Sequence, residues 1–291
     1  MKILHPSVNS QRLSLLTVSL VTFASLVTAW ANHPVLVEGN CSNPPAGNPA
    51  AVAVGTCGDF DGDGRIGTAE DSDGDRVFGT LNAANAAGAT PANNNGTITI
   101  VTSGTFAETV TLAGNVTLQA APGVEANIDA VLQGDPGSGA RQSAPGIIVN
   151  APANRYVIIR NITSRNWRSG IQVNGNSRVS IENCRLEHNT NYGVEVNDSA
   201  CVKVDKSEVI ATGFRLNPAT GDFPTTSQPN PGIGISFEDN SSGAVFRTEV
   251  AGSFAAGISD TSRGKVVLED VYLFDNKPNA AGIQGGGDDK H

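Results

Sequence analysis

Aromatic residues, charged residues and methionine are scarce in this sequence. Phe, Trp and Tyr make up 5% of the 291 residues, charged residues make up 16%, and Met occurs once. Glycine, by contrast, occurs 33 times. Glycine destabilises helix interiors but readily adopts the conformations that tight turns need. The composition therefore favours a β structure with many turns over a globular helical core.

An excess of positive charge is also missing. The chain contains 19 Lys and Arg residues against 28 Asp and Glu residues, and its formal net charge is -9. The basic residues do not form a stripe along the sequence. Because binding to a phosphate backbone depends on clustered cations, we expect no nucleic-acid partner.

Long apolar segments are absent apart from residues 13–27. This segment follows Lys2 and Arg12 and precedes Ala29-Trp30-Ala31, an order typical of a cleaved export signal. An uncleaved anchor is the alternative, but a membrane span needs about 20 apolar residues. We therefore interpret residues 1–31 as a signal peptide. The protein is expected to be secreted, periplasmic or at the cell surface, with no membrane span after cleavage.

The second half of the chain repeats itself. Six marker glycines, spaced by 24, 23, 41, 23 and 25 residues, begin similar segments: Gly146, Gly170, Gly193, Gly234, Gly257 and Gly282. A period in the low twenties, with two or three short β runs in each period, is typical of a parallel β-solenoid. The 41-residue spacing indicates an insertion over residues 214–231, and such insertions form loops that often carry binding function.

Alternation within the repeats predicts which side chains face the core. On one strand of each repeat, the inward side chains should be those of Ile171, Val173, Val194, Val196, Ile235 and Phe237. On a second strand, they should be those of Val157, Ile159, Val179, Ile181, Val202, Val204, Ala244, Phe246, Val266 and Leu268. Asn161 and Asn183 share a turn position with Thr248 and Asp270, where we expect hydrogen bonds to the backbone of neighbouring coils.

The four cysteines form two different pairs. Cys41 and Cys57 flank a Pro-, Gly- and Asn-rich segment, and in an exported protein they are candidates for a disulfide, which the sequence leaves open. Aligned repeats put Cys184 and Cys201 on adjacent coils but about six residues apart along the strand, too far for a bridge. We expect both of these thiols to be free.

Ahead of the repeats, the chain divides into segments of different composition. Residues 32–58 are interpreted as a loosely structured arm. Residues 59–76 are acidic, and residues 77–291 should form the solenoid, with strands starting at Thr97. The Ala-rich residues 78–87 predict a short helix that could cap the first coil, whose core and backbone would otherwise be open.

The acidic segment contains a complete calcium-binding loop of the EF-hand type. Calcium needs six to eight oxygen ligands, which this spacing supplies around a turn glycine, Gly64. The ligands at positions 1, 3, 5, 7 and 12 are Asp59, Asp61, Asp63, the carbonyl of Arg65, and Glu70. A second, weaker site is predicted at Asp71, Asp73 and Asp75, because Arg76 replaces the turn glycine there. The alternative is a solvated acidic linker, whose like charges would repel one another.

The repeat segments with Gly-Ile-x-Val and Val-x-Ile-x-Asn resemble the right-handed parallel β-helix superfamily that includes pectate lyases and pectinesterases. Residues 97–123 resemble its opening coil, in which Gly104, Phe106 and Glu108 match a Gly-x-aromatic-x-Glu turn. The resemblance covers residues 78–291. It implies an all-β, right-handed parallel β-helix with a short N-terminal capping helix.

Catalytic motifs of that superfamily are not found. The Gln-Asp turn and the Asp-Phe-x-Phe-Gly segment of pectinesterases are missing from the sequence. Acid–base or nucleophilic chemistry on glycans needs two titratable groups within reach of each other. Only one carboxylate occupies the outward positions of the marker-glycine strand, which are Ile148, Gln172, Glu195, Ser236, Ser259 and Gln284.

The sequence therefore favours an exported, calcium-stabilised binding module for polysaccharide without catalysis. One edge beside the insertion could gather Trp167, Arg168, His188, Tyr192, Phe214 and Arg215, which suit sugar rings and uronate carboxylates; scattered surface residues are the alternative. A rival hypothesis is a lyase, esterase or hydrolase that uses Glu195, His188, Arg168, Arg215 or Asp222. A third is a structural or adhesin-type spacer. The sequence does not fix the sugar or the oligomeric state.

Overall fold

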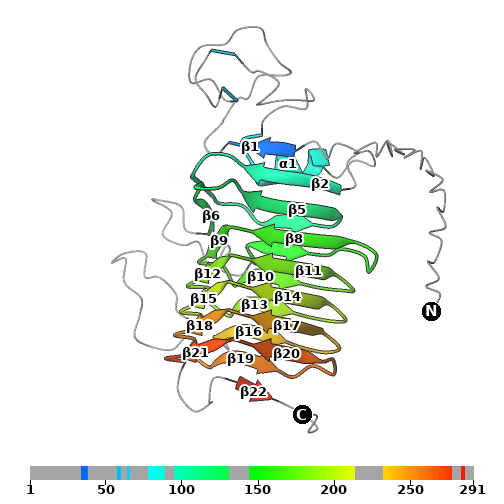
Figure 1. The fold of residues 1–291 in the computed structure, drawn as a ribbon, viewed down its shortest axis with the longest axis vertical. Helices are drawn as coiled ribbons and strands as arrows, with labels where there is room; N and C mark the ends of the chain where they lie inside the picture. Colours follow the sequence, from blue (N-terminus) through cyan, green and yellow to red (C-terminus); the bar gives the residue numbers. More distant parts are fainter. Residues whose placement is uncertain are drawn as a thin grey trace, which may run out of the picture. The chain divides into compact units, whose positions relative to one another are not determined.

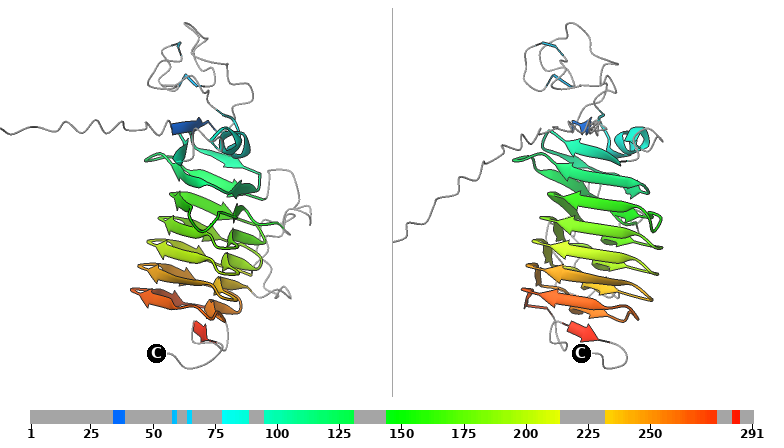
Figure 2. Two further views of the ribbon diagram at one scale, coloured as in Figure 1. Left: turned by 90° about the vertical axis from the view of Figure 1, so that its right-hand side faces the viewer. Right: turned by 45° about the vertical axis from the view of Figure 1, so that its right-hand side comes forward.

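The chain winds into stacked coils of short strands, and the strands of successive coils pair into three parallel sheets (Figures 1 and 2). The computed structural model describes residues 34–38, 58–59, 64–65, 78–88, 95–130, 144–213, 232–276 and 283–285. The chain divides into residues 1–31 and residues 32–291, and every described residue lies in the second unit. The predicted all-β, right-handed parallel β-helix is confirmed.

From β2 onward, each coil gives one strand to each sheet, and β1 extends the first sheet by one strand. The first sheet contains β1 (Pro34–Val37), β2 (Asn95–Ile100), β5 (Asn115–Ala120), β8 (Tyr156–Arg160), β11 (Arg178–Glu182), β14 (Cys201–Asp205), β17 (Ser242–Phe246) and β20 (Val266–Glu269). The second contains β4 (Val110–Leu112), β7 (Ile147–Val149), β10 (Ser169–Val173), β13 (Tyr192–Val196), β16 (Ile233–Phe237), β19 (Ala256–Asp260) and β22 (Ile283–Gly285). The third contains β3 (Gly104–Phe106), β6 (Ala126–Asp129), β9 (Ile162–Arg165), β12 (Arg185–Glu187), β15 (Glu208–Ile210), β18 (Glu249–Ala251) and β21 (Tyr272–Phe274).

Aliphatic ladders fill the space between the sheets. Val157, Val179 and Val202 are register partners on successive first-sheet strands, and all are at most 1% exposed. The second-sheet ladder from Ile171 through Val194 to Ile235 is fully buried. Each fully buried side chain of this kind contributes about 1.5–3 kcal/mol. The predicted core is thus confirmed for these strands.

The prediction for β17 is wrong by one residue. Gly243 and Val245, not Ala244 and Phe246, pair with the inward Val202 and Val204. A Cβ on Gly243 would lie 2.8 Å from Phe237 Cε1 and 2.2 Å from the Val202 carbonyl oxygen. The large ring of Phe237 therefore takes the interior space at this level, and Phe246 is on the outer face.

From β8 onward, the turn between each first-sheet strand and the following third-sheet strand contains one non-glycine residue in the left-handed conformation. Asn161, Asn183, Lys206, Arg247 and Asp270 have φ values of 45–55°. Asn161 and Asn183 are residue types that tolerate this conformation well, and Asn161 Nδ2 also donates to the Ala120 carbonyl (3.4 Å). The prediction that Thr248 shares this position is wrong, because Arg247 occupies it.

The N-terminal coil is closed by α1 (Leu81–Gly88), as predicted. Leu81 and Ala84 are fully buried against the first coil. The carboxylate of Glu108 accepts hydrogen bonds from the backbone N–H of Leu81 (2.7 Å) and Asn82 (3.0 Å). These N–H groups have no partner within the helix, so Glu108 joins the helix to the coil below it.

The interpretation of residues 32–58 as a loosely structured arm is wrong for β1. This strand pairs with β2 from Pro34↔Thr97 to Val37↔Ile100, so the first sheet begins well before residue 77. Val37 is fully buried, which explains why the strand docks. In the described part of the chain, no helix is both long and apolar enough to cross a bilayer.

Candidate ligand-binding groove and calcium loop

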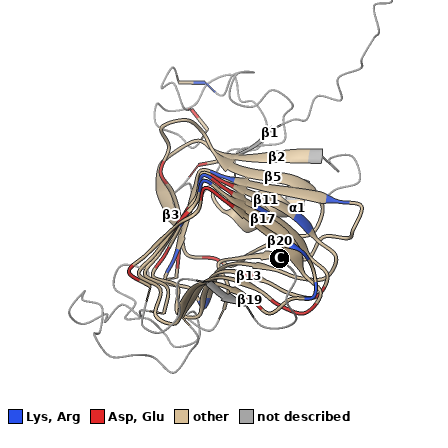
Figure 3. Cartoon of the chain, turned by 60° about the horizontal axis from the view of Figure 1, so that its bottom comes forward, with Lys and Arg blue, Asp and Glu red and all other residues tan. Residues whose placement is uncertain are grey.

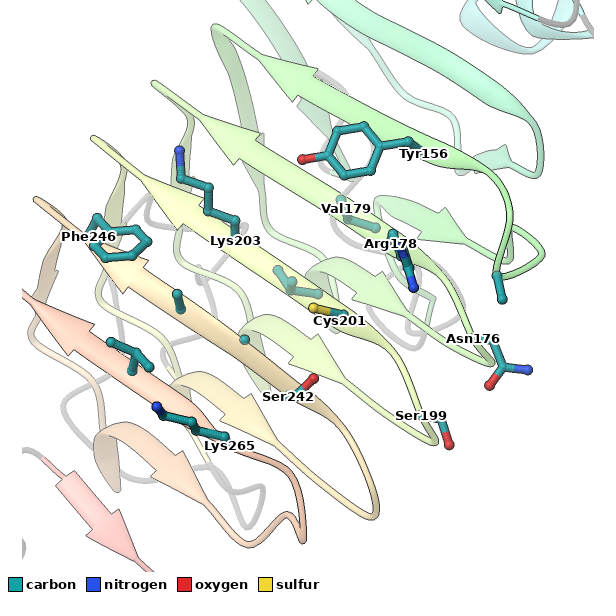
Figure 4. A pocket seen from close by; sticks show the side chains of 15 residues that line it. Tyr156, Asn176, Arg178, Val179, Ser199, Cys201, Lys203, Ser242, Phe246 and Lys265 are labelled. Carbon is teal, nitrogen blue, oxygen red and sulfur yellow. The ribbon is translucent and has the colours of Figure 1, made fainter. Parts of the chain in front are cut away.

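A groove of about 800 Å³ lies on the outer face of the first sheet (Figure 4). Strand register builds it. Tyr156, Arg178, Cys201 and Ser242 are successive partners on β8, β11, β14 and β17. Gly243 pairs with Val266, so Lys265 stands beside Ser242 on the next coil. One column of outward residues thus crosses five coils. This column was not predicted from the sequence, because the outward positions were considered on the second sheet alone.

Differences in side-chain size give the groove its floor and walls. Cys201, Ser242 and Ala244 are small and lie in the middle of the lining. Tyr156 stands at one end and is 46% exposed, and Phe246 lies along the far margin of the same sheet. The result is a shallow trough between aromatic rings on a rigid sheet.

The charges in the groove are of one sign. Arg178, Lys203 and Lys265 line it, and no Asp or Glu is among the described lining residues. Lys203 Nζ pairs with Asp205 (2.9 Å) and lies 5.8 Å from the centre of the Phe246 ring. Arg178 and Lys265 form no ion pair with any residue that the structure describes, and both are exposed.

The acidic residues of this sheet gather instead where its strands end. Figure 3 shows acidic and basic segments side by side at this corner of the β-helix. Arg160 pairs with Glu182 (2.7 Å), and Arg247 pairs with Asp205 (2.6 Å). Burial alone would raise the pKa of Asp205, but Lys203 and Arg247 outweigh it and hold the pKa below its usual value. The acidic side chains Glu182 and Asp205 at this corner are thus paired with basic ones, whereas Arg178 and Lys265 in the groove have no such partner among the described residues.

Two of the predicted catalytic candidates do meet on the second sheet. Glu195 is 7% exposed and lies in register between Gln172 and Ser236. Its Oε2 accepts hydrogen bonds from Arg168 Nη2 (2.9 Å) and Ser169 Oγ (2.6 Å). Both donors lie on the turn and strand of the preceding coil. The carboxylate is therefore held by a fixed set of donors.

His188 belongs to a different group of charges. It occupies a left-handed turn after β12, with φ 56°. Burial lowers its pKa, and Arg165 and Arg185 act in the same direction, against Glu187 and Asp129. These neighbours belong to the third-sheet strands β6, β9 and β12. Arg215 and Asp222 lie outside the described residues.

The predicted edge of aromatic and basic side chains is corrected at Trp167. This residue is 1% exposed, and its Nε1 donates to the Ile128 carbonyl (2.9 Å), so it is part of the core. Tyr192 is half-buried. Burial, followed by the nearby Glu238 and Glu195, raises its pKa to about 12. Phe214 lies outside the described residues.

The described part of the acidic segment is compatible with calcium. Asp59 is 8% exposed, and its Oδ2 accepts a hydrogen bond from the Gly64 N–H (3.2 Å). Gly64 has a φ of 80°, as a turn glycine requires. Asp59 Oδ1 is buried and has no hydrogen-bond partner among the residues that the structure describes. A buried, unpaired carboxylate oxygen is costly unless a cation or donor meets it, so the residue fits a hard metal ion.

Both ends of the acidic segment are fixed to one residue after β1. Glu38 accepts a hydrogen bond from the Gly58 N–H (2.6 Å) and donates its own N–H to the Phe78 carbonyl (3.0 Å). The remaining predicted ligands, Asp61, Asp63 and Glu70, lie outside the described residues, as do those of the second site, Asp71, Asp73 and Asp75. Elsewhere in the described chain, no three His, Cys, Asp or Glu side chains cluster closely enough to hold a metal.

The two cysteines of the repeats are free, as predicted. Cys184 is buried, and burial raises the pKa of its thiol to about 12. Cys201 is exposed on the groove floor and pairs in register with Arg178. Cys41 and Cys57 lie outside the described residues.

Comparison with known proteins agrees with the architecture. Residues 92–227 match the family described as right handed beta helix region. No curated protein and no solved structure matches the chain. The match and the three parallel sheets agree that the fold is a right-handed parallel β-helix.

Proposed function

We propose that this protein is an exported, calcium-stabilised β-helix that binds polysaccharide along the first-sheet groove without cleaving it. The groove is the observation that carries this proposal. It is open, it extends over five coils, and its lining comes from strands whose positions are fixed by the sheet. An extended polymer fits such a trough better than a compact small molecule, which is usually enclosed on most sides.

The side chains of the groove suit sugars. Tyr156 and Phe246 offer flat apolar faces, and Ser199, Ser242 and Asn176 offer hydrogen-bonding groups between them. Aromatic rings that are amphipathic or exposed commonly serve as contact surfaces, and polar groups fix the orientation of the ligand. Because the strands are rigid, little conformational entropy is lost when a ligand binds.

The absence of cleavage is supported by the chemistry of the lining. No carboxylate and no histidine is found among the described residues of the groove. On the second sheet, Arg168 and Ser169 hold Glu195, and its two register neighbours, Gln172 and Ser236, do not titrate. An acid–base pair on a glycan needs a second titratable group facing the first.

Calcium has a structural role in this proposal. Asp59 contributes a buried carboxylate, and Glu38 fixes both ends of the acidic segment beside the first coil. An ion in this loop would neutralise carboxylates that otherwise repel one another. Its effect should be on the stability of the N-terminal coil and not on the groove.

A panel of acidic and neutral polysaccharides, followed both for binding and for released products, tests the proposal. We expect saturable binding without change in polymer length. Tyr156→Ala and Phe246→Ala should each weaken binding about tenfold, which corresponds to about 1.4 kcal/mol. Tyr272→Ala is the matched control, because Tyr272 is 66% exposed but lies on the third sheet.

Two results would overturn the proposal. Cleavage products that the native protein releases and the Glu195→Gln variant does not would establish the rival hypothesis of an enzyme with its site on the second sheet. No binding to any polymer would favour the structural spacer.

A further inference from the structure

The groove carries a second piece of information, namely the charge of its ligand. In a chain with 28 acidic and 19 basic residues, the described groove lining contains three basic residues and no acidic one. The first-sheet acids Glu182, Asp205 and Glu269 stand in another outward column, at the end of each strand. Phe246 stands in that same column, so these acids lie at the Phe246 margin of the groove and are not among its lining residues.

Not all three cations are equally available. Lys203 is held by Asp205 and lies near the ring of Phe246, so it helps to fix that ring in place. Arg178 and Lys265 are exposed and have no acidic partner in the part of the chain that the structure describes. They stand in the same column, three strands apart. With about 4.8 Å between neighbouring strands, their backbones are roughly 14 Å apart.

We propose that the groove selects an anionic polysaccharide, with Arg178 and Lys265 binding two acidic groups of one chain. This inference rests on the proposed function and adds the charge of the ligand and the residues that recognise it. Arg178 can take a carboxylate or sulfate oxygen pair in a bidentate fashion, and Lys265 acts as a point charge. Tyr156, one coil beyond Arg178, and Phe246, one coil from Lys265, then contact the uncharged faces of the sugars.

Two kinds of anionic sugar share this chemistry, and the experiment separates them. The probes are polygalacturonate, which carries carboxylates, dextran sulfate, which carries sulfate esters, and their neutral counterparts, fully methyl-esterified polygalacturonate and dextran. Affinity is measured by calorimetry for the native protein, for Arg178→Gln, for Lys265→Gln and for the double variant. Lys206→Gln is the control, because it removes the same charge from an exposed turn residue outside the groove lining.

We expect at least one acidic polymer to bind tenfold or more tightly than its neutral counterpart. Each groove variant should reduce that preference severalfold, the double variant should abolish it, and raising the salt concentration should weaken the acidic polymer selectively. Lys206→Gln should leave the preference for the acidic polymer unchanged. Whichever acidic polymer shows the effect identifies carboxylate or sulfate as the recognised group.

The result separates the two proposals. Equal binding of acidic and neutral polymers, unaffected by the groove variants, would overturn the charge selectivity and leave polysaccharide binding intact. A preference for acidic polymers that survives the double variant would also overturn the assignment of Arg178 and Lys265. Loss of binding to every polymer would refute the proposed function itself. Unchanged thermal unfolding of each variant shows that the fold is retained.

Discussion

Gly243 and Phe237 share one volume inside the β-helix. A Cβ added to Gly243 would come within 2.8 Å of Phe237 Cε1 and within 2.2 Å of the Val202 carbonyl oxygen. Phe237 is fully buried, and the neighbouring strands are fixed by the ladder hydrogen bonds of the sheet. The interior therefore has no room for a larger residue at this level.

Gly243→Ala should destabilise the protein as a consequence. Overpacking a rigid interior costs about 1–3 kcal/mol, so we expect a loss of this size in the free energy of unfolding in urea. Gly114→Ala is the control, because a Cβ at Gly114 would meet no atom within 4 Å. Equal stability of the two variants would contradict the packing argument.

Asp205→Asn tests the charges at the corner between the first and third sheets. Arg247 and Lys203 are about half exposed, so solvent screens them and the loss at pH 7 should be about 1 kcal/mol. The pKa of Asp205 is lower in the folded than in the unfolded protein, so its contribution is present above pH 3.8 and is lost as pH falls through the folded pKa. The stability difference between native and variant should therefore shrink in acid.

The pair of Glu208 and Arg185 supplies a comparison for this prediction. Both side chains are 47% exposed, so Glu208→Gln should change the stability by less than about 0.5 kcal/mol. A larger loss for Glu208→Gln than for Asp205→Asn would show that burial of the carboxylate does not decide the effect.

The two free cysteines should differ in reactivity. Cys201 is exposed, whereas the thiol of Cys184 is buried with a pKa of about 12 and so has almost no thiolate at neutral pH. Iodoacetamide followed by peptide mass spectrometry should label Cys201 in the folded protein. Cys184 should be labelled only after unfolding, and rapid labelling of Cys184 in native buffer would contradict its burial.

Calcium removal should lower the thermal stability. If the ion binds only the folded protein, a calcium concentration 100 times the Kd stabilises it by about 2.7 kcal/mol. Asp59→Ala should reduce or abolish the rise in Tm on adding calcium, because it removes the buried carboxylate of the loop. Glu125→Gln, which changes an exposed carboxylate in another turn, should retain it. A Tm that does not respond to calcium would refute the metal site.

The repeat pattern predicts the fold well because alternation in several strands fixes the register of their neighbours. Val179 and Val202 could be aligned correctly since Val179 lies between Arg178 and Ser180, and Val202 is followed by Lys203. The alternation fails in β17, where Ser242, Gly243 and Ala244 are all small and give no contrast between inner and outer faces. Only the three-dimensional packing against Phe237 shows that Gly243 faces inward.

The candidate site was harder to predict for a related reason. Arg168 and Glu195 were both named from the sequence, but their direct contact depends on a turn whose geometry the alternation does not describe. Trp167 was expected on the surface because a Trp beside an Arg in a turn suits ligand binding, yet its ring enters the core. The groove column joins Tyr156, Arg178 and Lys265, which have different chemistry and so give no repeated pattern.

The closure of one end by α1 gives the β-helix a direction of unfolding. In a stack where each coil contacts mainly its neighbours, each coil is stabilised by the coils on either side of it. The coil with the fewest stabilising contacts therefore unfolds first. α1 and Glu108 cover the first coil, whereas β20 and β21 are the last described strands of their sheets, and every residue in them is partly or largely exposed. Backbone amides of β20 and β21 should therefore exchange with deuterium before those of β2 and β5, so that the protein peels from one end.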